Sequence, residues 1–84
     1  MNFTAVVSVS LKDSILDPAG RVLLDSLGKL GYDTVTDVRA GKQFRLSLSG
    51  ERSEVEAQLA EFANGVLANP VIETVEWDLQ EAEG

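Results

Sequence analysis

Residues 37–48, DVRAGKQFRLSL, decide the fold of this chain, because they stand between two copies of one pattern of strand, helix and strand. Ala40-Gly41-Lys42 is predicted to form a tight turn between two short strands. Gly41 suits the left-handed position of a type I turn with a G1 bulge. The turn therefore divides the chain into two half-domains.

The first half-domain opens with a strand at residues 3–11, where apolar side chains alternate with others that are mostly Ser or Thr. A helix is predicted over residues 18–30. Asp17 is a good N-cap for it, and Pro18 suits the first helical position, where no N–H is needed. Gly31 follows the last leucine of the helix and is expected to end it.

A second strand is predicted over residues 32–39, although Val35 and Val38 have opposite parity and require a bulge or a strand open on both faces. The second half-domain repeats the pattern. Its elements are a third strand at 43–49, a helix at 54–68 that Asn69-Pro70 ends, and a last strand at 71–79.

The element order β-α-β-β-α-β predicts an α+β fold, the ferredoxin-like split βαβ sandwich. Its antiparallel sheet has the strand order 4-1-3-2, with both helices on one face. Residues 1–79 form a single domain, and residues 80–84 a short acidic C-terminal tail. A chain of 84 residues is marginally stable alone, and it has no cysteine for a disulfide. We therefore expect the uncovered sheet face or an edge strand to pair with a second copy.

Composition excludes several classes of function. The formal net charge is −7, and phosphate backbones and anionic membrane surfaces repel such an acidic protein. Neither nucleic acid nor a membrane is therefore expected as a partner. The N-terminus has no basic segment and no long apolar run, so it is not a signal peptide or a membrane span, and a cytoplasmic protein is expected. The chain has no Cys and no His, which removes the commonest metal ligands and general base.

No motif in the sequence predicts catalysis or metal binding. Ala40-Gly41-Lys42 has one glycine on a hairpin, whereas a P-loop needs several glycines before a helix. The acidic pairs Asp13/Asp17 and Glu73/Glu76 are better explained as a helix cap and as solvated charges than as acid–base partners. The serines lack a histidine base. We expect no catalytic residue, no metal ligand and no cofactor in this chain.

The predicted topology brings three distant loops to one end of the sheet, namely residues 12–17, 39–42 and 68–71. We call this end the rim, and we expect a partner protein to dock there. Arg39 and Lys42 have no evident structural reason to be cationic. The candidate docking residues are Lys12, Ile15, Leu16, Asp17, Arg39, Gly41, Lys42, Asn69 and Pro70.

The same three loops carry a resemblance that covers nearly the whole chain. The stretches LKDSILDPAG (11–20), LGYDTVTDVRAGKQF (30–44) and VLANPVIE (66–73) resemble the PurS family. PurS is the small subunit of phosphoribosylformylglycinamidine synthase, an enzyme of purine biosynthesis.

The resemblance implies a dimeric, non-catalytic adaptor. The complex converts formylglycinamide ribonucleotide (FGAR), glutamine and ATP into formylglycinamidine ribonucleotide (FGAM). The glutaminase subunit PurQ releases ammonia, and the synthetase subunit PurL uses ATP and Mg²⁺ to activate the amide oxygen. PurS joins the two and helps to pass ammonia between them.

Two other functions fit the predicted topology. An ACT-like regulatory domain would bind a small effector at a dimer interface, but the loop after the first strand is not rich in glycine. An acylphosphatase-like enzyme needs an arginine in that loop, where Lys12 is the only cation.

Overall fold

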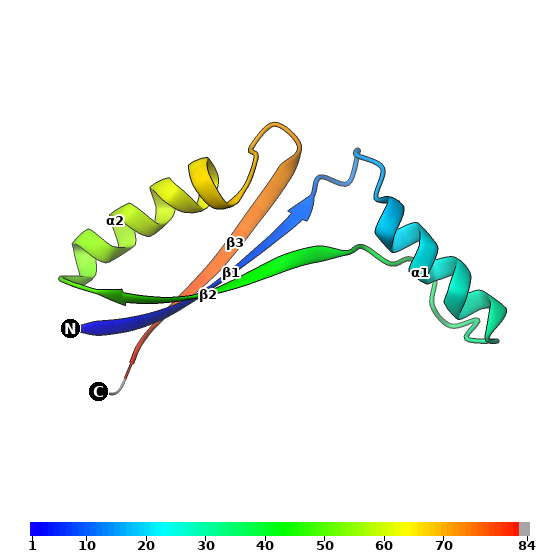
Figure 1. The fold of residues 1–84 in the computed structure, drawn as a ribbon, viewed down its shortest axis with the longest axis horizontal. Coiled ribbons are helices and arrows are strands. Elements are labelled where there is room, and N and C mark those ends of the chain that lie inside the picture. Colours follow the sequence, from blue (N-terminus) through cyan, green and yellow to red (C-terminus); the bar gives the residue numbers. More distant parts are fainter. Residues whose placement is uncertain (83–84) are drawn as a thin grey trace.

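The computed structural model describes residues 1–82, and its elements follow the order β-α-β-α-β (Figure 1). They are β1 (Asn2–Leu11), α1 (Pro18–Lys29), β2 (Gly41–Ser49), α2 (Arg52–Phe62), a π-helical turn η1 (Ala63–Leu67) and β3 (Glu73–Glu81). The α+β class is confirmed. Three of the four predicted strands form, as do both helices if η1 is counted with α2.

The three strands make one antiparallel sheet in the order β2-β1-β3. These neighbours are the predicted first, third and fourth strands in their expected places. Apolar side chains alternate along β1, so one face of the sheet buries Phe3, Ala5, Val7 and Val9, each at most 2% exposed. The register sets Val7 between Phe44 and Trp77 on that face. The opposite face carries mainly hydroxyl, amide and charged side chains.

Helix α2 covers the apolar face along the central strand. Val55 and Leu59 from α2, and Ala63 from η1, are buried against it. A fully buried leucine contributes about 1.5–3 kcal/mol relative to an exposed one, so this contact supplies much of the core. The flanking strands β2 and β3 are covered less completely, since Phe44 and Leu79 are only half-buried.

The predicted strand at residues 32–39 does not form, and the predicted order 4-1-3-2 is therefore reduced to three strands. Val35 and Val38 would point to opposite faces of a strand, so the segment has no single apolar face to bury against a sheet. It contacts α1 instead. The backbone of Val38 lies so close to Gly20 that a side chain there would meet the Val38 carbonyl oxygen. The segment thus packs against α1 and does not extend the sheet.

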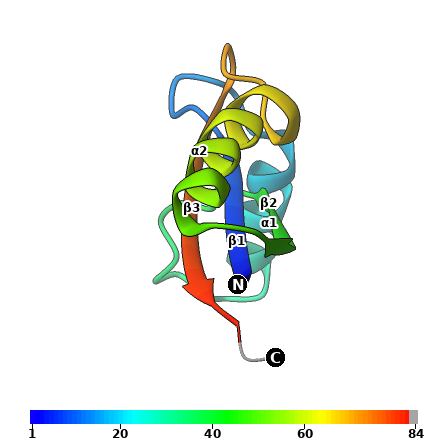
Figure 2. The ribbon, with the colours of Figure 1, turned by 90° about the vertical axis from the view of Figure 1, so that its left-hand side faces the viewer.

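Helix α1 lies beyond the end of the sheet, which corrects the prediction that both helices cover one face. Figure 1 shows it projecting away, at the opposite end of the molecule from α2, and in Figure 2, seen from the α2 end, it lies behind the sheet. The molecule is accordingly long and thin, with extents of 50 × 30 × 14 Å. We call residues 12–40 the arm and the remaining part of the chain the sheet unit.

Gly41 does not have the predicted left-handed conformation. The described glycines with positive φ are Gly31 and Gly50. Gly31, at φ +91°, ends α1 as predicted. Gly41 instead begins β2, where a Cβ atom would lie 2.5 Å from the carbonyl oxygen of Val9. Glycine is needed here for the close approach of β1 and β2, and not for a turn.

The sheet extends into the predicted C-terminal tail. Gln80 and Glu81 pair with Thr4 and Phe3, so the predicted boundary at residue 79 falls two residues before the end of β3. The last two residues of the predicted tail, 83–84, lie outside the described residues.

We expect Leu59→Ala to destabilise the protein by about 2–5 kcal/mol, because it empties a fully buried position under α2. Urea unfolding followed by far-UV circular dichroism measures this. Leu16→Ala removes the same atoms from a side chain that is 76% exposed, and should change stability by less than about 0.5 kcal/mol. Equal effects of the two substitutions would contradict the core described above.

Candidate functional site

The structure brings the three loops of the rim together at the end of the sheet nearest α1 (Figure 1). The N–H of Lys12 donates to the carbonyl oxygen of Ile72 at 2.9 Å, which joins the loop after β1 to the loop before β3. The side chain of Arg39 reaches into the loop after β1 from the other direction. Segments far apart in the sequence therefore form one continuous surface.

Asp17 fastens the arm to the sheet unit. Its carboxylate accepts hydrogen bonds from the N–H of Gly20, at 3.1 Å, and from the N–H of Ala40, at 2.6 Å. The side chain is only 6% exposed. These two hydrogen bonds, with a further contribution from the nearby Arg39 charge, hold the pKa of the Asp17 carboxyl below its ordinary value, although burial acts in the opposite sense. Asp17 is the predicted N-cap and also ties α1 to the start of β2.

Arg39 has a structural role that the sequence did not suggest. Its Nη2 atom donates to the carbonyl oxygens of Lys12 and Ile15, at 2.9 and 3.0 Å, and lies 3.4 Å from that of Leu11. A guanidinium can donate hydrogen bonds to several carbonyl oxygens at once in a fixed planar geometry. A lysine ammonium makes such bonds with a less fixed geometry. The prediction that nothing in the fold requires a cation at this position is wrong. We call Asp17, Gly20, Val38, Arg39 and Ala40 the joint.

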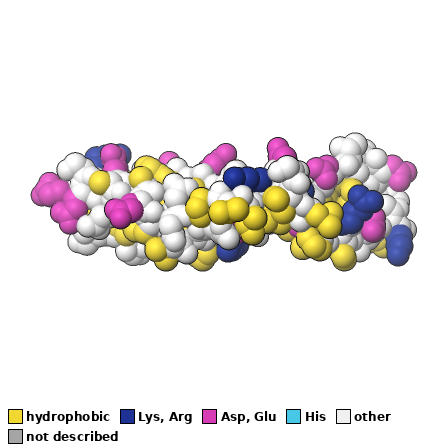
Figure 3. All heavy atoms as spheres, turned by 90° about the horizontal axis from the view of Figure 1, so that it is seen from above, with side chains coloured by type: hydrophobic (Ala, Val, Ile, Leu, Met, Phe, Trp, Pro, Cys, Tyr) yellow, Lys and Arg dark blue, Asp and Glu magenta, His cyan; other side chains and the backbone are white. Residues whose placement is uncertain are grey.

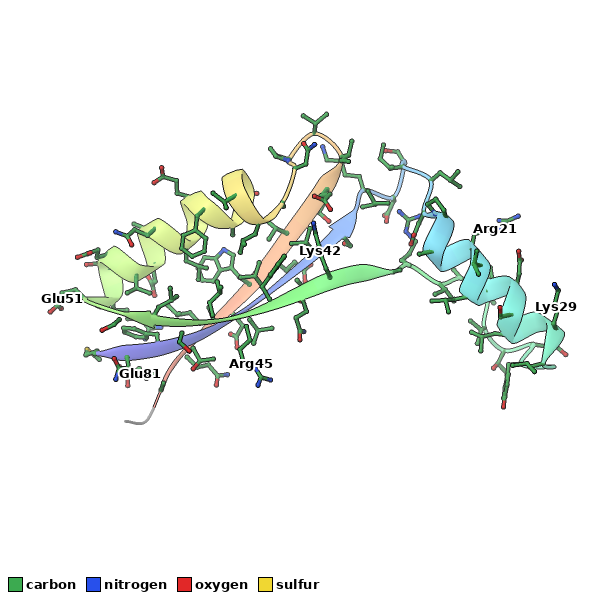
Figure 4. All side chains as sticks on the ribbon, in the orientation of Figure 1. Arg21, Lys29, Lys42, Arg45, Glu51 and Glu81 are labelled. Carbon is green, nitrogen blue, oxygen red and sulfur yellow. The ribbon has the colours of Figure 1, made fainter. Side chains whose placement is uncertain are left out.

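The two lysines of the rim differ in their surroundings. Lys42 lies 3.7 Å from Glu73 and 6.0 Å from the centre of the Phe44 ring. Figure 4 shows Lys42 on the α2 side of the sheet, whereas Arg45 of the same strand points to the other side. Lys12 is half-buried and makes no ion pair with any residue in the described range 1–82. Among the three predicted cations, Arg39 is engaged by backbone carbonyls and Lys42 lies beside a carboxylate, whereas Lys12 has no ion pair within residues 1–82.

Asn69 and Pro70 shape the loop before β3. The Asn69 side chain accepts a hydrogen bond from the backbone N–H of Val71 at 3.0 Å, and the backbone N–H of Asn69 donates to the Glu73 carboxylate at 2.7 Å. Pro70 is exposed. The loop is therefore ordered by its own side chains, and it presents the residues that follow Pro70 to solvent.

Exposed apolar side chains gather on the rim. Leu16 is 76% exposed, Val71 75% and Ile72 38%, while Ile15 is half-buried. Figure 3, viewed from above, shows hydrophobic side chains over the middle of the molecule, where these loops lie. Val71 and Ile72 were not among the predicted docking residues. The sequence could have indicated them, because two large apolar residues directly after Asn-Pro can belong to the loop and not to the strand that follows.

The described part of the rim was compared with two kinds of chemical site. Among the described residues, no three carboxylates lie close enough together to hold a metal ion. Arg39, which reaches into the loop after β1, is already bound to backbone carbonyls and does not form the phosphate cradle that an acylphosphatase-like enzyme requires. Within residues 1–82, no helix is both long and apolar enough to cross a membrane. What the rim offers is an exposed apolar cluster framed by charged and polar side chains.

Comparison with known proteins gives one consistent family. Residues 4–81 match the family model described as PurS, phosphoribosylformylglycinamidine (FGAM) synthase. Among the curated relatives, the phosphoribosylformylglycinamidine synthase subunit PurS of Mycobacterium leprae is 44% identical over 69 residues, which cover 82% of this chain and 85% of the relative.

Solved structures agree with this match. PurS of Methanocaldococcus jannaschii, described as one of the subunits of formylglycinamide ribonucleotide amidotransferase, superposes with a TM-score of 0.85 at 30% identity, covering 96% of this chain and 99% of that one. A chain of PurLQS from Thermotoga maritima shares the fold, with a TM-score of 0.86 at 22% identity and coverage of 95% and 99%.

We expect the joint to make stability depend on pH. Because the folded-state pKa of Asp17 is lowered, its contribution is present above the ordinary value of 3.8 and is lost as the pH falls through the folded-state value. Asp17→Asn should lower stability at pH 7 and should lose less stability than the wild type on acidification below about pH 4. Urea unfolding at a series of pH values measures both effects.

The matched control is Asp25→Asn, which removes an exposed carboxylate from the same helix. Its stability should follow the wild-type curve with pH. An Asp17→Asn curve that runs parallel to the wild-type curve at all pH values would refute this role for the carboxylate.

Proposed function

The chain belongs to the PurS family, and from this membership we propose that it is a non-catalytic subunit of FGAM synthase that joins the glutaminase subunit PurQ to the synthetase subunit PurL. The complete enzyme converts FGAR, glutamine and ATP into FGAM. PurQ releases ammonia from glutamine, and PurL uses ATP and Mg²⁺ to activate the amide oxygen of FGAR. This chain binds no cofactor itself and aids the transfer of ammonia by holding the other two subunits in place.

The exposed apolar cluster of the rim is the observation that carries this proposal. Leu16, Val71 and Ile72 come from two loops that are fixed to each other by the hydrogen bond between Lys12 and Ile72. Protein interfaces commonly concentrate their binding energy in a few apolar anchors surrounded by polar residues. A rigid apolar cluster on a domain without catalytic side chains suits docking better than chemistry.

The partners follow from the family. A chain with this fold occurs in the structure described as PurLQS, which supports PurL and PurQ as the proteins that bind here. We also propose that the chain associates with further copies of itself, because a small domain with so much exposed apolar surface gains stability from oligomerisation. We propose a cytoplasmic location, which suits a subunit of purine biosynthesis.

We expect that PurL and PurQ form FGAM from glutamine efficiently only when this chain is present. The rim variant Leu16→Asp/Val71→Asp should weaken binding of the chain to PurL and PurQ at least about tenfold, because it puts two charges into the apolar cluster. Product formation from glutamine and binding by calorimetry measure the two effects. If PurL and PurQ make FGAM equally well without the chain, the proposal fails.

Two controls separate docking from folding. Val66→Asp places one charge on a side chain that is 78% exposed in η1 and is not part of the three rim loops, and it should leave binding unchanged. Supplying ammonia in place of glutamine should restore FGAM formation by PurL when the rim variant is used. Loss of the ammonia-dependent reaction as well would point to a role in PurL itself, and not in joining the subunits.

A further inference from the structure

Strand β3 forms an open edge of the sheet. It pairs with β1 on one side and with no other strand within residues 1–82. The strand is nine residues long, contains no proline, and keeps an unbroken register with β1 from Glu73 to Glu81. Natural proteins commonly protect an edge strand by making it short, by bending it with a bulge or a proline, or by placing charges on it. Of these devices β3 has the charges alone, so its backbone is able to accept a further strand.

The hydrogen bonds just beyond the two ends of β3 identify the backbone groups that face the open edge. At one end the carbonyl oxygen of Ile72 accepts from the loop after β1, and at the other the N–H of Ala82 donates to β1. Hydrogen-bonded positions alternate along an antiparallel strand, so the even-numbered residues of β3 bond to β1. The N–H and C=O groups of the odd-numbered residues therefore point outward, and those in the middle of the strand belong to Val75, Trp77 and Leu79.

The side chains along this edge differ between the two faces of the sheet. Val75 and Leu79 are half-buried on the face that α2 covers, and Trp77 on the same face is 39% exposed. The residues between them, Glu76 and Asp78, are exposed on the opposite face, which we call the open face. A strand added at this edge would therefore have apolar neighbours on one face and carboxylates on the other.

Charge determines which strand this edge favours. β3 contains four Asp or Glu and no Lys or Arg. Neither Glu76 nor Asp78 makes an ion pair with any residue in the described range 1–82. Opposite charges that face each other across two strands stabilise the pair, whereas like charges destabilise it. The β3 strand of a second copy is therefore repelled, because setting Trp77 opposite its own copy would put Glu76 opposite Asp78.

The β2 strand of a second copy matches the edge only in part. Arg45 is the one charged residue on the open face of β2, so it would face just one of the two carboxylates. Pairing of β2 in one chain with β3 in the next is also a head-to-tail contact, which leads to rings or to open-ended filaments. The charges therefore favour a segment of a different protein that has a cation for each carboxylate.

We propose that the β3 edge binds an extended segment of another protein, in which apolar side chains alternate with Lys or Arg, as an added antiparallel strand. Its apolar side chains pack beside Val75, Trp77 and Leu79, and its cations face Glu76 and Asp78 on the open face. The outward N–H and C=O groups of the same three apolar residues supply the backbone hydrogen bonds of strand addition. This surface lies along β3, outside the three rim loops, and goes beyond the adaptor role proposed above.

A synthetic peptide, capped at both ends, tests the edge on the full chain. The sequence KVKVKVK sets valines beside the apolar residues of β3 and lysines opposite its carboxylates. The matched control KKVVVKK has the same composition and charge, but it cannot place its valines and lysines on opposite faces of a strand. We expect KVKVKVK to bind at least about tenfold more tightly in calorimetry, because several cross-strand pairs form at once. Equal affinities for the two peptides would overturn the proposal.

Amide hydrogen exchange, followed residue by residue by NMR, shows where the peptide lies. With KVKVKVK at ten times its dissociation constant, exchange at Val75, Trp77 and Leu79 should slow about tenfold, because only the unoccupied fraction of the chains exchanges there. The N–H groups of Glu76 and Asp78 already bond to β1 and should change little. Binding without this alternation along β3 would overturn the proposal, wherever else the peptide gives protection.

Reversal of the two carboxylates gives an independent measurement. Glu76→Lys/Asp78→Lys should bind KVKVKVK at least about tenfold more weakly and should acquire binding of EVEVEVE, because the facing charges are exchanged. Glu54→Lys/Glu61→Lys makes the same change in net charge at exposed positions of α2 and should leave the affinity for KVKVKVK as it is.

Equal losses in the two variants would mean that the peptide responds to net charge alone, and would overturn the proposal. Native mass spectrometry of the unmodified chain tests the second copy as occupant. Rings or filaments that Glu76→Lys/Asp78→Lys abolishes would assign the edge to β2 of another copy, and would likewise overturn the proposal. The reconstitution with PurL and PurQ tests the adaptor role separately.

Discussion

The carboxylate of Asp17 accepts hydrogen bonds from the N–H groups of Gly20 and Ala40, and so fastens the start of α1 to the start of β2. The direction of the arm follows from this contact. The close contact between Gly20 and the Val38 backbone acts in the same direction. Arg39 completes the arrangement by holding the carbonyls of the loop after β1, because a buried or crowded carbonyl without a donor is costly.

The joint changes how the rim is understood. Several conspicuous polar residues there act inside the fold: Asp17 and Arg39 support the backbone, and Asn69 orders its own loop. The surface left for a partner is mainly apolar, with Lys12 beside it. The residues that make a family recognisable in its sequence are therefore partly those that build the surface, and not only those that touch what binds to it.

Much of the fold could be predicted from the sequence, because local chemistry decides it. The alternation along β1, the Asp17-Pro18 start of α1 and the stop at Gly31 all appear in the structure. The second strand and the place of α1 could not be predicted, since periodicity identifies an apolar side of an element but not the surface that covers it. The three loops predicted to share one end of the sheet do meet there, whereas Val71 and Ile72, which were predicted to begin the last strand, lie in the loop before it.

The slender connection between the arm and the sheet unit has a mechanical consequence. The twelve residues of α1 make a rod about 18 Å long that is fastened at one end, at Asp17. A rotation of about 10° at Asp17 would carry the far end of α1 roughly 3 Å, more than half a helical turn of 5.4 Å. The rim surrounds the pivot. A small displacement of the loops around Arg39 would therefore become a larger displacement of the far end of α1.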